Sequence, residues 1–198
     1  MSRPIAKDHD EKRGHILAVA ARVFSRQGVA RASMAQVATA CGISKANIYH
    51  YYDSKDALLF DILDSYLSAL RDRVAALPME GLDPAAQLGA IVTEVLRAYD
   101  GMDHEHKIQT EGIALLPEAQ RKVLHDYQRA LVARLSDVIA AAAPEAFAGD
   151  ARKLRATVMS VFGMLNWFYM WNARAGRAER DAYADLVTRL TLGGVRDA

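Results

Sequence analysis

Residues 33–52 read SMAQVATACGISKANIYHYY, a pattern that predicts two short helices joined by a tight turn. Ser33 and Ser44 each stand where an N-cap would begin a helix, and Gly42 stands where the first helix would end. Ala38 is small at the point where the two helices would cross. These features are typical of a helix-turn-helix, whose second helix can lie in the roughly 12 Å wide major groove of DNA.

The sequence on both sides of this stretch predicts more helices and no strands. Apolar residues recur every three to four positions over 10–27, where Gly28 follows, and over 55–77, where Pro78 follows. No segment alternates polar and apolar residues as a strand with a hairpin turn does. We therefore expect an all-α fold of about nine helices. The other expected helices, which share the same spacing, cover 84–99, 103–115, 118–142, 151–174 and 179–192.

The composition is that of a globular protein, with 52% hydrophobic and 25% charged residues. Cys41 is the only cysteine, which excludes an intramolecular disulfide and argues against a structural zinc site. Residues 1–14 carry charges of both signs and no apolar run of the kind that a secretory signal needs. The most apolar run, 161–171, is shorter than the ~20 residues that span a bilayer. We therefore expect a cytoplasmic protein with no membrane partner.

The charge is distributed unevenly along the chain, although the net charge is only +1. Residues 1–55 hold nine Lys or Arg and four Asp or Glu, whereas residues 56–198 hold sixteen and twenty. The N-terminal part is therefore the basic one, as expected of a segment that meets a polyanion.

Residues 37–59, VATACGISKANIYHYYDSKDALL, resemble the helix-turn-helix of the TetR family of transcriptional repressors. The match combines the small-residue turn, the Tyr-x-Tyr-Tyr ending of the second helix and the Ser-Lys-Asp start of the next one. AARVFSRQG, residues 20–28, also resembles the family. The resemblance implies a DNA-binding domain over residues 1–54, followed by an effector-binding and dimerisation domain over 55–198.

The resemblance implies DNA contacts from the start of the helix at 34–41 and from the helix that follows it. Polar side chains there can reach phosphates or base edges, and tyrosines can hydrogen-bond phosphate while their rings pack. Ala46 departs from the family, in which many members carry glycine, and its methyl can meet a thymine methyl. The implied DNA-binding residues are Ser33, Met34, Ser44, Lys45, Ala46, Asn47, Tyr49, His50, Tyr51 and, at a phosphate, Lys55.

A dimer is expected because one recognition helix reads too few base pairs for useful selectivity. The resemblance implies a homodimer on a palindromic double-stranded DNA operator, with half-sites roughly 34–36 Å apart or a multiple of that. In the family the last two long helices form a four-helix bundle with their mates. The residues here that fit such an interface, and equally fit a protomer core, are Leu154, Val158, Val161, Leu165, Phe168, Tyr169, Leu186, Val187 and Leu190.

The resemblance also implies a mostly apolar effector pocket. Residues 106–124 and 162–171 resemble regulators that sense acyl-coenzyme A, above all repressors of phenylacetate degradation, whose inducer is phenylacetyl-CoA. Asn166 fits a thioester carbonyl and equally fits a buried amide at the dimer seam. Basic residues that fit the phosphates are Lys107, Arg121 and Arg129, which equally fit a solvated surface. The expected pocket residues are Leu96, Tyr99, Ile113, Leu116, Tyr127, Leu131, Phe162, Asn166 and Met170.

The expected mechanism is repression that the effector relieves. The free dimer would hold both recognition helices at groove spacing, and the effector would favour a splayed conformation that cannot fit both half-sites. The helix at 55–77 would transmit the change. The sequence itself leaves the operator, the regulated genes and the sign of control open.

Other functions are weighed against this one. The sequence has no Gly-x-Ser-x-Gly elbow, phosphate loop, dinucleotide fingerprint or His-Glu-x-x-His motif, so no enzyme and no cofactor are expected. Asp103, His104, His106 and Glu111 form a polar cluster, but histidines two apart on a helix point about 200° apart, so no metal site is expected. Two alternatives are a same-fold regulator of efflux or lipid genes that senses a lipophilic compound, and a helical small-molecule-binding protein that does not bind DNA.

Overall fold

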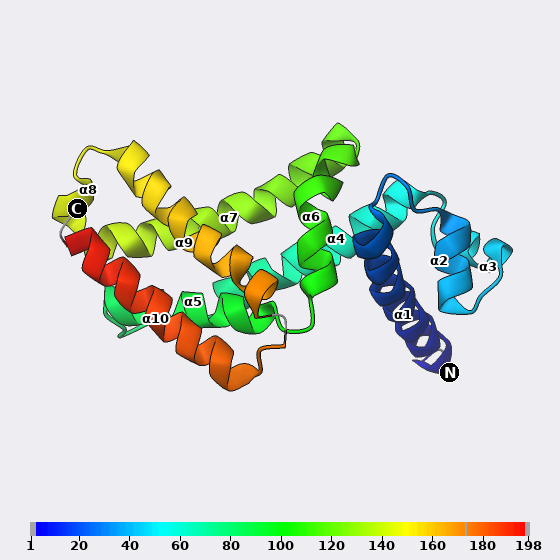
Figure 1. The fold of residues 1–198 in the computed structure, drawn as a ribbon, viewed down its shortest axis with the longest axis horizontal. Coiled ribbons are helices and arrows are strands. Elements are labelled where there is room, and N and C mark those ends of the chain that lie inside the picture. The colour runs from blue at the N-terminus through cyan, green and yellow to red at the C-terminus, as the bar shows by residue number, and fades with distance from the viewer. Residues whose placement is uncertain (1–2, 173, 197–198) are drawn as a thin grey trace. The chain divides into compact units, whose positions relative to one another are not determined.

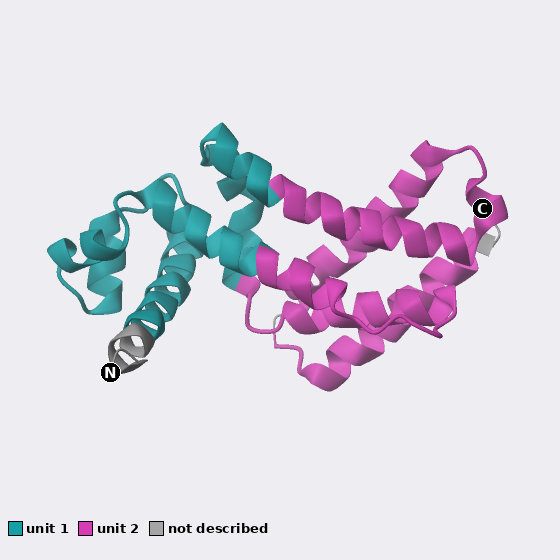
Figure 2. Ribbon diagram, turned by 180° about the vertical axis from the view of Figure 1, so that it is seen from behind, with its two compact units in different colours: residues 1–67, 104–124 teal, residues 68–103, 125–198 magenta. Residues whose placement is uncertain are grey.

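The computed structural model describes residues 3–172 and 174–196, with side chains for 9–172 and 174–195. Over these ranges the chain forms ten α-helices and no strand (Figure 1). It divides into two compact units, residues 1–67 with 104–124 and residues 68–103 with 125–198 (Figure 2). No helix of the described ranges is long and apolar enough to cross a bilayer. The all-α prediction is therefore confirmed.

The helices follow one another with short connections. Every expected helix is present, and one extra turn forms after Pro144, which occupies a first helical position that tolerates proline. The first helix begins earlier than expected, since the charged residues before position 10 continue it. The helices are α1 (Arg3–Gln27), α2 (Met34–Cys41), α3 (Lys45–Tyr51), α4 (Lys55–Ala75), α5 (Pro84–Ala98), α6 (Asp103–Leu115), α7 (Glu118–Ala142), α8 (Pro144–Phe147), α9 (Ala151–Trp171) and α10 (Arg177–Arg196).

Helices α2 and α3 begin and end at the residues that the sequence indicates. The Ser33 hydroxyl accepts from the Gln36 backbone N–H at 3.3 Å, and the Ser33 N–H donates to Gln36 Oε1 at 2.8 Å, which makes a capping box. Gly42 ends α2 with φ 69°, in the left-handed region that glycine tolerates best. The Ser44 hydroxyl accepts from the Asn47 N–H at 3.0 Å and begins α3.

The N-terminal unit has a core that connects α1, α2, α3, α4 and α6. Phe24 and Ile48 are fully buried, and α1 packs on α2, which packs on α3. Gly112 of α6 lies so close to α4 that an added Cβ would meet Leu59 Cδ1 at 3.3 Å. Because glycine has no side chain, these two helices can approach more closely than larger residues would allow.

The C-terminal unit is built around the pair α5 and α10, which pack along each other. Leu88, Val92 and Val95 of α5 are fully buried, as is Val187 of α10. Ion pairs join the same two helices at the surface, since Arg97 Nε donates to Asp181 Oδ1 at 2.7 Å and Arg97 Nη2 to Oδ2 at 2.8 Å. The unit is therefore held by apolar packing inside and by a two-bond guanidinium–carboxylate pair outside.

Candidate functional site

Helix α3 presents a polar face to solvent. Lys45, Asn47 and His50 are exposed, and Tyr49 is 42% exposed. Ile48 is fully buried and anchors the helix on the core of the unit. A short helix with one buried anchor and an outward polar face has the form that enters a major groove. Ser44 and Ala46 are also exposed on this face.

Several of the other expected DNA-binding residues are already engaged within the protein. The Tyr51 ring stacks on the His9 ring of α1 with centroids 5.1 Å apart. Met34 is 6% exposed, so its side chain lies in the core rather than at the surface. The Ser33 hydroxyl is exposed but occupied by the capping box. A contact of Met34 with DNA would therefore have to use its backbone.

Lys55 contacts the loop between α1 and α2. Its ammonium donates to the carbonyl oxygens of Val29 at 2.9 Å, Ala30 at 3.1 Å and Ala32 at 3.2 Å. All three donor hydrogens of an ammonium can be used in this way. Lys55 therefore fixes the start of α2 from the start of α4, and the expected phosphate contact would have to replace one of these three hydrogen bonds.

A partly exposed ion pair that sequence reasoning missed fixes α1 and α4 against the end of α3. Arg13 Nε donates to Asp61 Oδ2 at 2.9 Å, and the Tyr52 hydroxyl donates to the same oxygen at 2.6 Å. Burial, and then the hydrogen bond to Asp61, raises the pKa of Tyr52 above its usual value. No local pattern could have found this network, because Arg13 and Asp61 are 48 residues apart.

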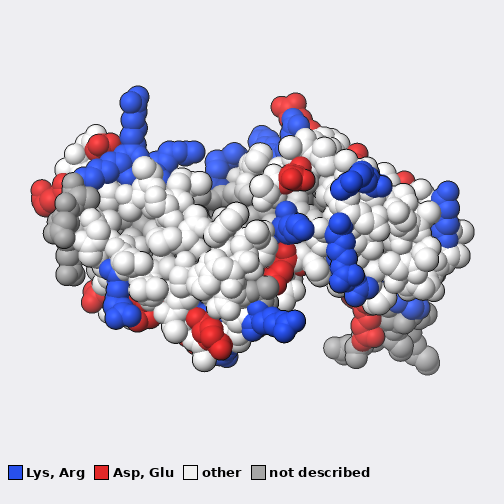
Figure 3. Space-filling model, viewed as in Figure 1, with Lys and Arg blue, Asp and Glu red and all other residues white. Residues whose placement is uncertain are grey.

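Basic side chains accompany this polar face. In Figure 3, Lys and Arg side chains stand out from the visible surface of the part of the chain that carries α1 to α3. Arg22, Arg26 and Arg31 are exposed, in addition to Lys45. Cys41 lies nearby and is not a reactive thiolate, since burial raises the pKa of its thiol.

The residues expected at the dimer interface fall into two groups. Val158, Val161, Leu165, Phe168 and Val187 are buried within the protomer, and Leu154 and Tyr169 are partly buried. Leu186 and Leu190 are exposed, at 43% and 57%. These two residues are therefore free to meet a second chain, whereas the first group mainly fills the core.

Helix α9 exposes large apolar side chains, of which the sequence indicated only Met170 as a site residue, and that one for the pocket. Met159, Trp167, Met170 and Trp171 are between 47% and 62% exposed. Their spacing of three, four and eight residues places them along one side of the helix. The sequence shows these large apolar residues, but α9 is apolar around most of its circumference. The periodicity of apolar residues therefore does not distinguish its exposed side from its buried side.

The expected pocket residues of the C-terminal unit include a hydrogen-bonded pair of one buried and one half-buried side chain. The Tyr99 hydroxyl donates to Asn166 Oδ1 at 2.8 Å, and burial raises the pKa of that hydroxyl. Leu96, Leu131 and Phe162 are buried in the same unit. Met170 differs from expectation, because it is 53% exposed. Tyr127 is partly buried in this unit, whereas Ile113 and Leu116 are buried in the N-terminal unit.

The two histidines of the polar cluster have different partners, both in the N-terminal unit. His104 Nδ1 lies 2.8 Å from the Ser25 hydroxyl of α1, and His106 Nδ1 lies 2.8 Å from the Tyr66 hydroxyl of α4. His106 is buried. Within the described ranges no group of three or more His, Cys, Asp or Glu gathers as a metal site. These histidines connect α6 to α1 and α4.

Two family models match the chain. The first, for bacterial regulatory proteins of the tetR family, covers residues 16–62. The second, for tetracyclin repressor-like C-terminal domains, covers residues 81–195. Together they include the polar face of α3 and nearly all of the C-terminal unit.

Known relatives agree with these matches. A TetR-family transcriptional regulator from Bordetella parapertussis 12822 has a solved structure with a TM-score of 0.84 and 33% identity, covering 91% of this chain and 93% of that one. The repressor KstR2 of Rhodococcus jostii is 32% identical over 109 residues, 54% of this chain and 52% of its own length. The chain thus spans about half of that curated relative. The structure of AibR in complex with isovaleryl coenzyme A and operator DNA has a TM-score of 0.74 at 23% identity, covering 90% of this chain and 97% of that one.

Proposed function

Because the chain belongs to the tetR family of bacterial regulatory proteins, we propose that it is a transcriptional repressor that binds a palindromic operator as a homodimer and is released by a small-molecule effector. The observation that carries this proposal is the exposed polar face of α3 on its single buried anchor, Ile48. Lys45, Asn47 and Tyr49 are the side chains of that face best suited to phosphates and base edges.

Electrostatics favour DNA as the partner of the N-terminal segment. Residues 1–55 hold nine Lys or Arg and four Asp or Glu. A protein whose basic side chains neutralise DNA phosphates releases the counterions condensed on the DNA. Its affinity for DNA should therefore fall steeply as salt is added. Lys55 supports the same function indirectly, since its three hydrogen bonds to backbone oxygens hold α2 in place behind the recognition helix.

The homodimer is proposed to form through one face of α9 and α10. Helix α9 exposes Trp167 and Trp171, and α10 exposes Leu186 and Leu190. Several large apolar side chains exposed together are typical of a protein interface. A two-fold dimer through these helices would present two copies of α3, as a palindrome requires.

The effector is proposed to be an acyl-coenzyme A, with phenylacetyl-CoA as the first compound to test. The partly buried Tyr99–Asn166 pair among apolar residues offers hydrogen-bonding groups to a thioester carbonyl. AibR, which shares the fold, binds isovaleryl coenzyme A and operator DNA. Residues of α4 belong to both compact units, so α4 is the helix through which an effector in one unit would change the other. Moving a two-state equilibrium from mostly bound to mostly released needs a preference of roughly 5.5 kcal/mol for the released state.

The test is a fluorescence anisotropy titration on fragments that the protein retains from sheared genomic DNA, at about 0.15 M salt. Nanomolar binding that phenylacetyl-CoA or isovaleryl-CoA reverses is the expected result. The Lys45→Ala, Tyr49→Ala double variant should bind at least about 100-fold more weakly with an unchanged circular dichroism spectrum. Lys122→Ala, an exposed lysine of α7, is the matched control.

Each outcome is informative. If the protein binds every DNA with the same weak affinity, the repressor proposal is wrong and a helical small-molecule-binding protein is favoured instead. If DNA binds selectively but neither thioester releases it, the acyl-CoA part is wrong and the regulatory part stands.

A further inference from the structure

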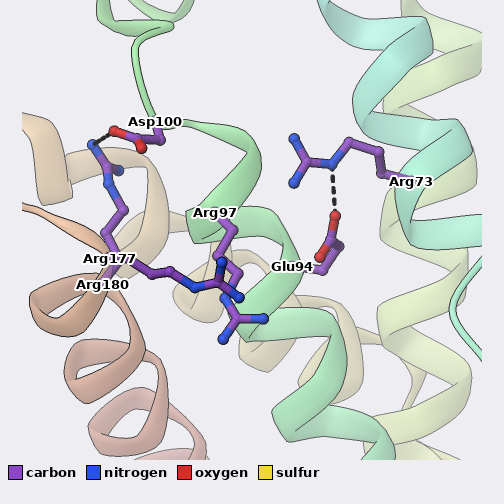
Figure 4. Close-up of a pocket in the computed structure, with 6 residues that line it drawn as sticks. All are labelled: Arg73, Glu94, Arg97, Asp100, Arg177 and Arg180. Carbon is purple, nitrogen blue, oxygen red and sulfur yellow. Dashed lines mark hydrogen bonds and ion pairs between the residues drawn. The ribbon is translucent and has the colours of Figure 1, made fainter.

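Two clefts on the C-terminal unit are lined by arginines, and they differ in how those arginines are paired. The first has a volume of about 280 Å³ and is lined by two carboxylates and four arginines (Figure 4). Its lining residues are Arg73, Glu94, Arg97, Asp100, Arg177 and Arg180. The second has a volume of about 290 Å³ and is lined by two arginines and four apolar residues, Arg71, Val74, Ala75, Ala130, Leu131 and Arg134.

Each arginine of the first cleft lies beside a carboxylate of the protein, and Arg97 and Arg177 share Asp181. Arg73 Nε lies 2.6 Å from Glu94 Oε1, and Arg180 Nη2 lies 3.3 Å from Asp100 Oδ1, as the dashed lines in Figure 4 mark. Arg97 makes both of its bonds to Asp181. These pairs connect α4 to α5 and α5 to α10. Arg180 Nε is also buried without an acceptor, but its Nη1 donates to the Leu96 carbonyl at 3.2 Å and its Nη2 pairs with Asp100. The first cleft is therefore explained as a structural ion-pair cluster.

The second cleft contains an arginine with no carboxylate. Arg134 forms no ion pair or side-chain hydrogen bond within the described part of the chain, and its Nε is buried without an acceptor. By contrast Arg129, on the same helix, pairs with Asp126 and is exposed. A buried guanidinium N–H without an acceptor costs free energy, which an anion that accepts from this guanidinium would recover.

The other arginine of this cleft, Arg71, is held in place by the protein. Its Nη2 lies 2.6 Å from Asp72 Oδ1, and its guanidinium carbon lies 4.3 Å from the centre of the Tyr127 ring. A guanidinium that is already oriented loses less conformational entropy when a ligand binds. Val74 and Leu131 are buried between α4 and α7 and add apolar surface beside the two charges.

We propose that the cleft between α4 and α7 binds the phosphate end of an organic phosphate that has an apolar part, with Arg134 as the principal ligand and Arg71 as the second. Guanidinium groups donate two parallel N–H bonds to phosphate. The cleft is at the small end of the roughly 300–1,000 Å³ of ligand sites, which fits part of a ligand rather than the whole. The inference deepens the proposed function and rests on it in one respect, because an acyl-coenzyme A effector would supply such phosphates.

The assignment differs from what the sequence suggested for the phosphates. Arg129 is exposed and already paired, and Lys107 is exposed on α6 in the other unit. Arg121 is half-buried and also belongs to that unit. None of these three lines either cleft.

The test follows the arginine Nε–Hε signals of the full-length, DNA-free protein by NMR during titration with inorganic pyrophosphate and, separately, with coenzyme A. The signal of Arg134, assigned from its loss in Arg134→Ala, should shift and saturate with coenzyme A. Arg134→Ala should weaken coenzyme A binding about tenfold or more, since one charge-assisted pair is lost. Arg134→Lys, which keeps the charge, should lose less, and Arg152→Ala, an exposed arginine of α9, should lose nothing measurable.

The same titrations distinguish the two possible sources of the phosphate. Binding of coenzyme A at least tenfold tighter than pyrophosphate supports a nucleotide thioester as the source, and equal affinities support a free phosphate or phosphorylated metabolite at the same arginines. The proposal is overturned if neither probe gives a saturable shift, or if Arg129→Ala rather than Arg134→Ala abolishes it. Thermal unfolding shows whether Arg134→Ala is folded. If Arg134→Ala is unstable, the conservative variant Arg134→Lys is used for the test instead.

Failure here is distinguishable from failure of the proposed function. Operator binding by Arg134→Ala without any effector should equal that of the unaltered protein, because the proposal assigns Arg134 no role in DNA binding. A protein that binds no operator but still binds coenzyme A at Arg134 would refute the repressor proposal alone.

Discussion

Helices α3 and α9 both expose one side, but the chemistry of the two sides is opposite. Helix α3 buries Ile48 and exposes polar groups, which water can hydrogen-bond. Its exposed side therefore needs no protein partner to be stable in water. Helix α9 buries Val158 and Leu165 and exposes Trp167 and Trp171, whose apolar surface water does not satisfy. The comparison shows that the exposed side of α3 is compatible with water, whereas the exposed side of α9 is the one that the proposed second copy would cover.

The largest expected effect breaks the dimer. Trp167→Glu would place a carboxylate in the apolar interface, so the dimer dissociation constant should rise by at least about 100-fold. Light scattering after size exclusion should then give the mass of a monomer, and operator affinity should fall with it. Lys122→Glu, which changes an exposed charge on α7, should leave the dimer intact. A Trp167→Glu protein that stays dimeric would show that α9 is not the interface.

The next largest effect removes the anchor of α3. Ile48→Ala should lower the free energy of unfolding by about 2–5 kcal/mol, because it deletes a fully buried side chain. Urea unfolding measures this loss. Tyr49→Phe, one residue away on the exposed side, should change stability by less than about 0.5 kcal/mol while weakening operator binding. Equal losses of stability in the two variants would contradict the assigned orientation of α3.

A smaller effect distinguishes the contribution of a helix cap to stability from its contribution to operator binding. Ser44→Ala and Ser54→Ala each remove a hydroxyl that accepts from a backbone N–H at 3.0 Å, at the start of α3 and α4 respectively. Both should cost about 1 kcal/mol of stability. Operator affinity should fall only for Ser44→Ala, since it orients the seven-residue α3. Anisotropy titrations that show equal losses would mean that the cap of α3 has no special role.

The smallest effect concerns acid stability of the C-terminal unit. The hydrogen bonds from Arg97 hold the pKa of Asp181 below its usual value. A depressed folded pKa means that the pair stabilises the fold above about pH 4 and that this contribution is lost as pH falls through the folded pKa. Asp181→Asn should therefore unfold with a shallower pH dependence below about pH 4. Asp137→Asn, an exposed carboxyl of α7, should reproduce the original acid slope.

The two regions also differ in how much the sequence could predict. The caps and turn of α2 and α3 depend on residues within four positions of each other, so the roles of Ser33, Gly42 and Ser44 are predictable from the sequence. The three carbonyl contacts of Lys55 span 23 to 26 residues and carry no local signal. In α9 every candidate is apolar, and only the packing of the unit decides that Val158 is buried while Trp167 is exposed.

The effector region was the least predictable. The sequence places many apolar residues there, and Tyr99–Asn166 could be suspected only from its polarity. Which arginine lacks a partner depends on the carboxylates that folding brings near it, so Arg134 could not be distinguished from Arg129 before the structure was known.

The single anchor of α3 bears on how this regulator can evolve. Of the seven residues of α3, one is buried and the others are exposed or half-buried. Substitutions on the outward side should therefore cost little in folding, and under the proposed function they would change which operator is recognised. Selection for stability in α3 would act almost entirely on Ile48 and the caps. The exposed residues could then change during evolution without loss of the fold. DNA-binding specificity would therefore diverge faster than the fold does.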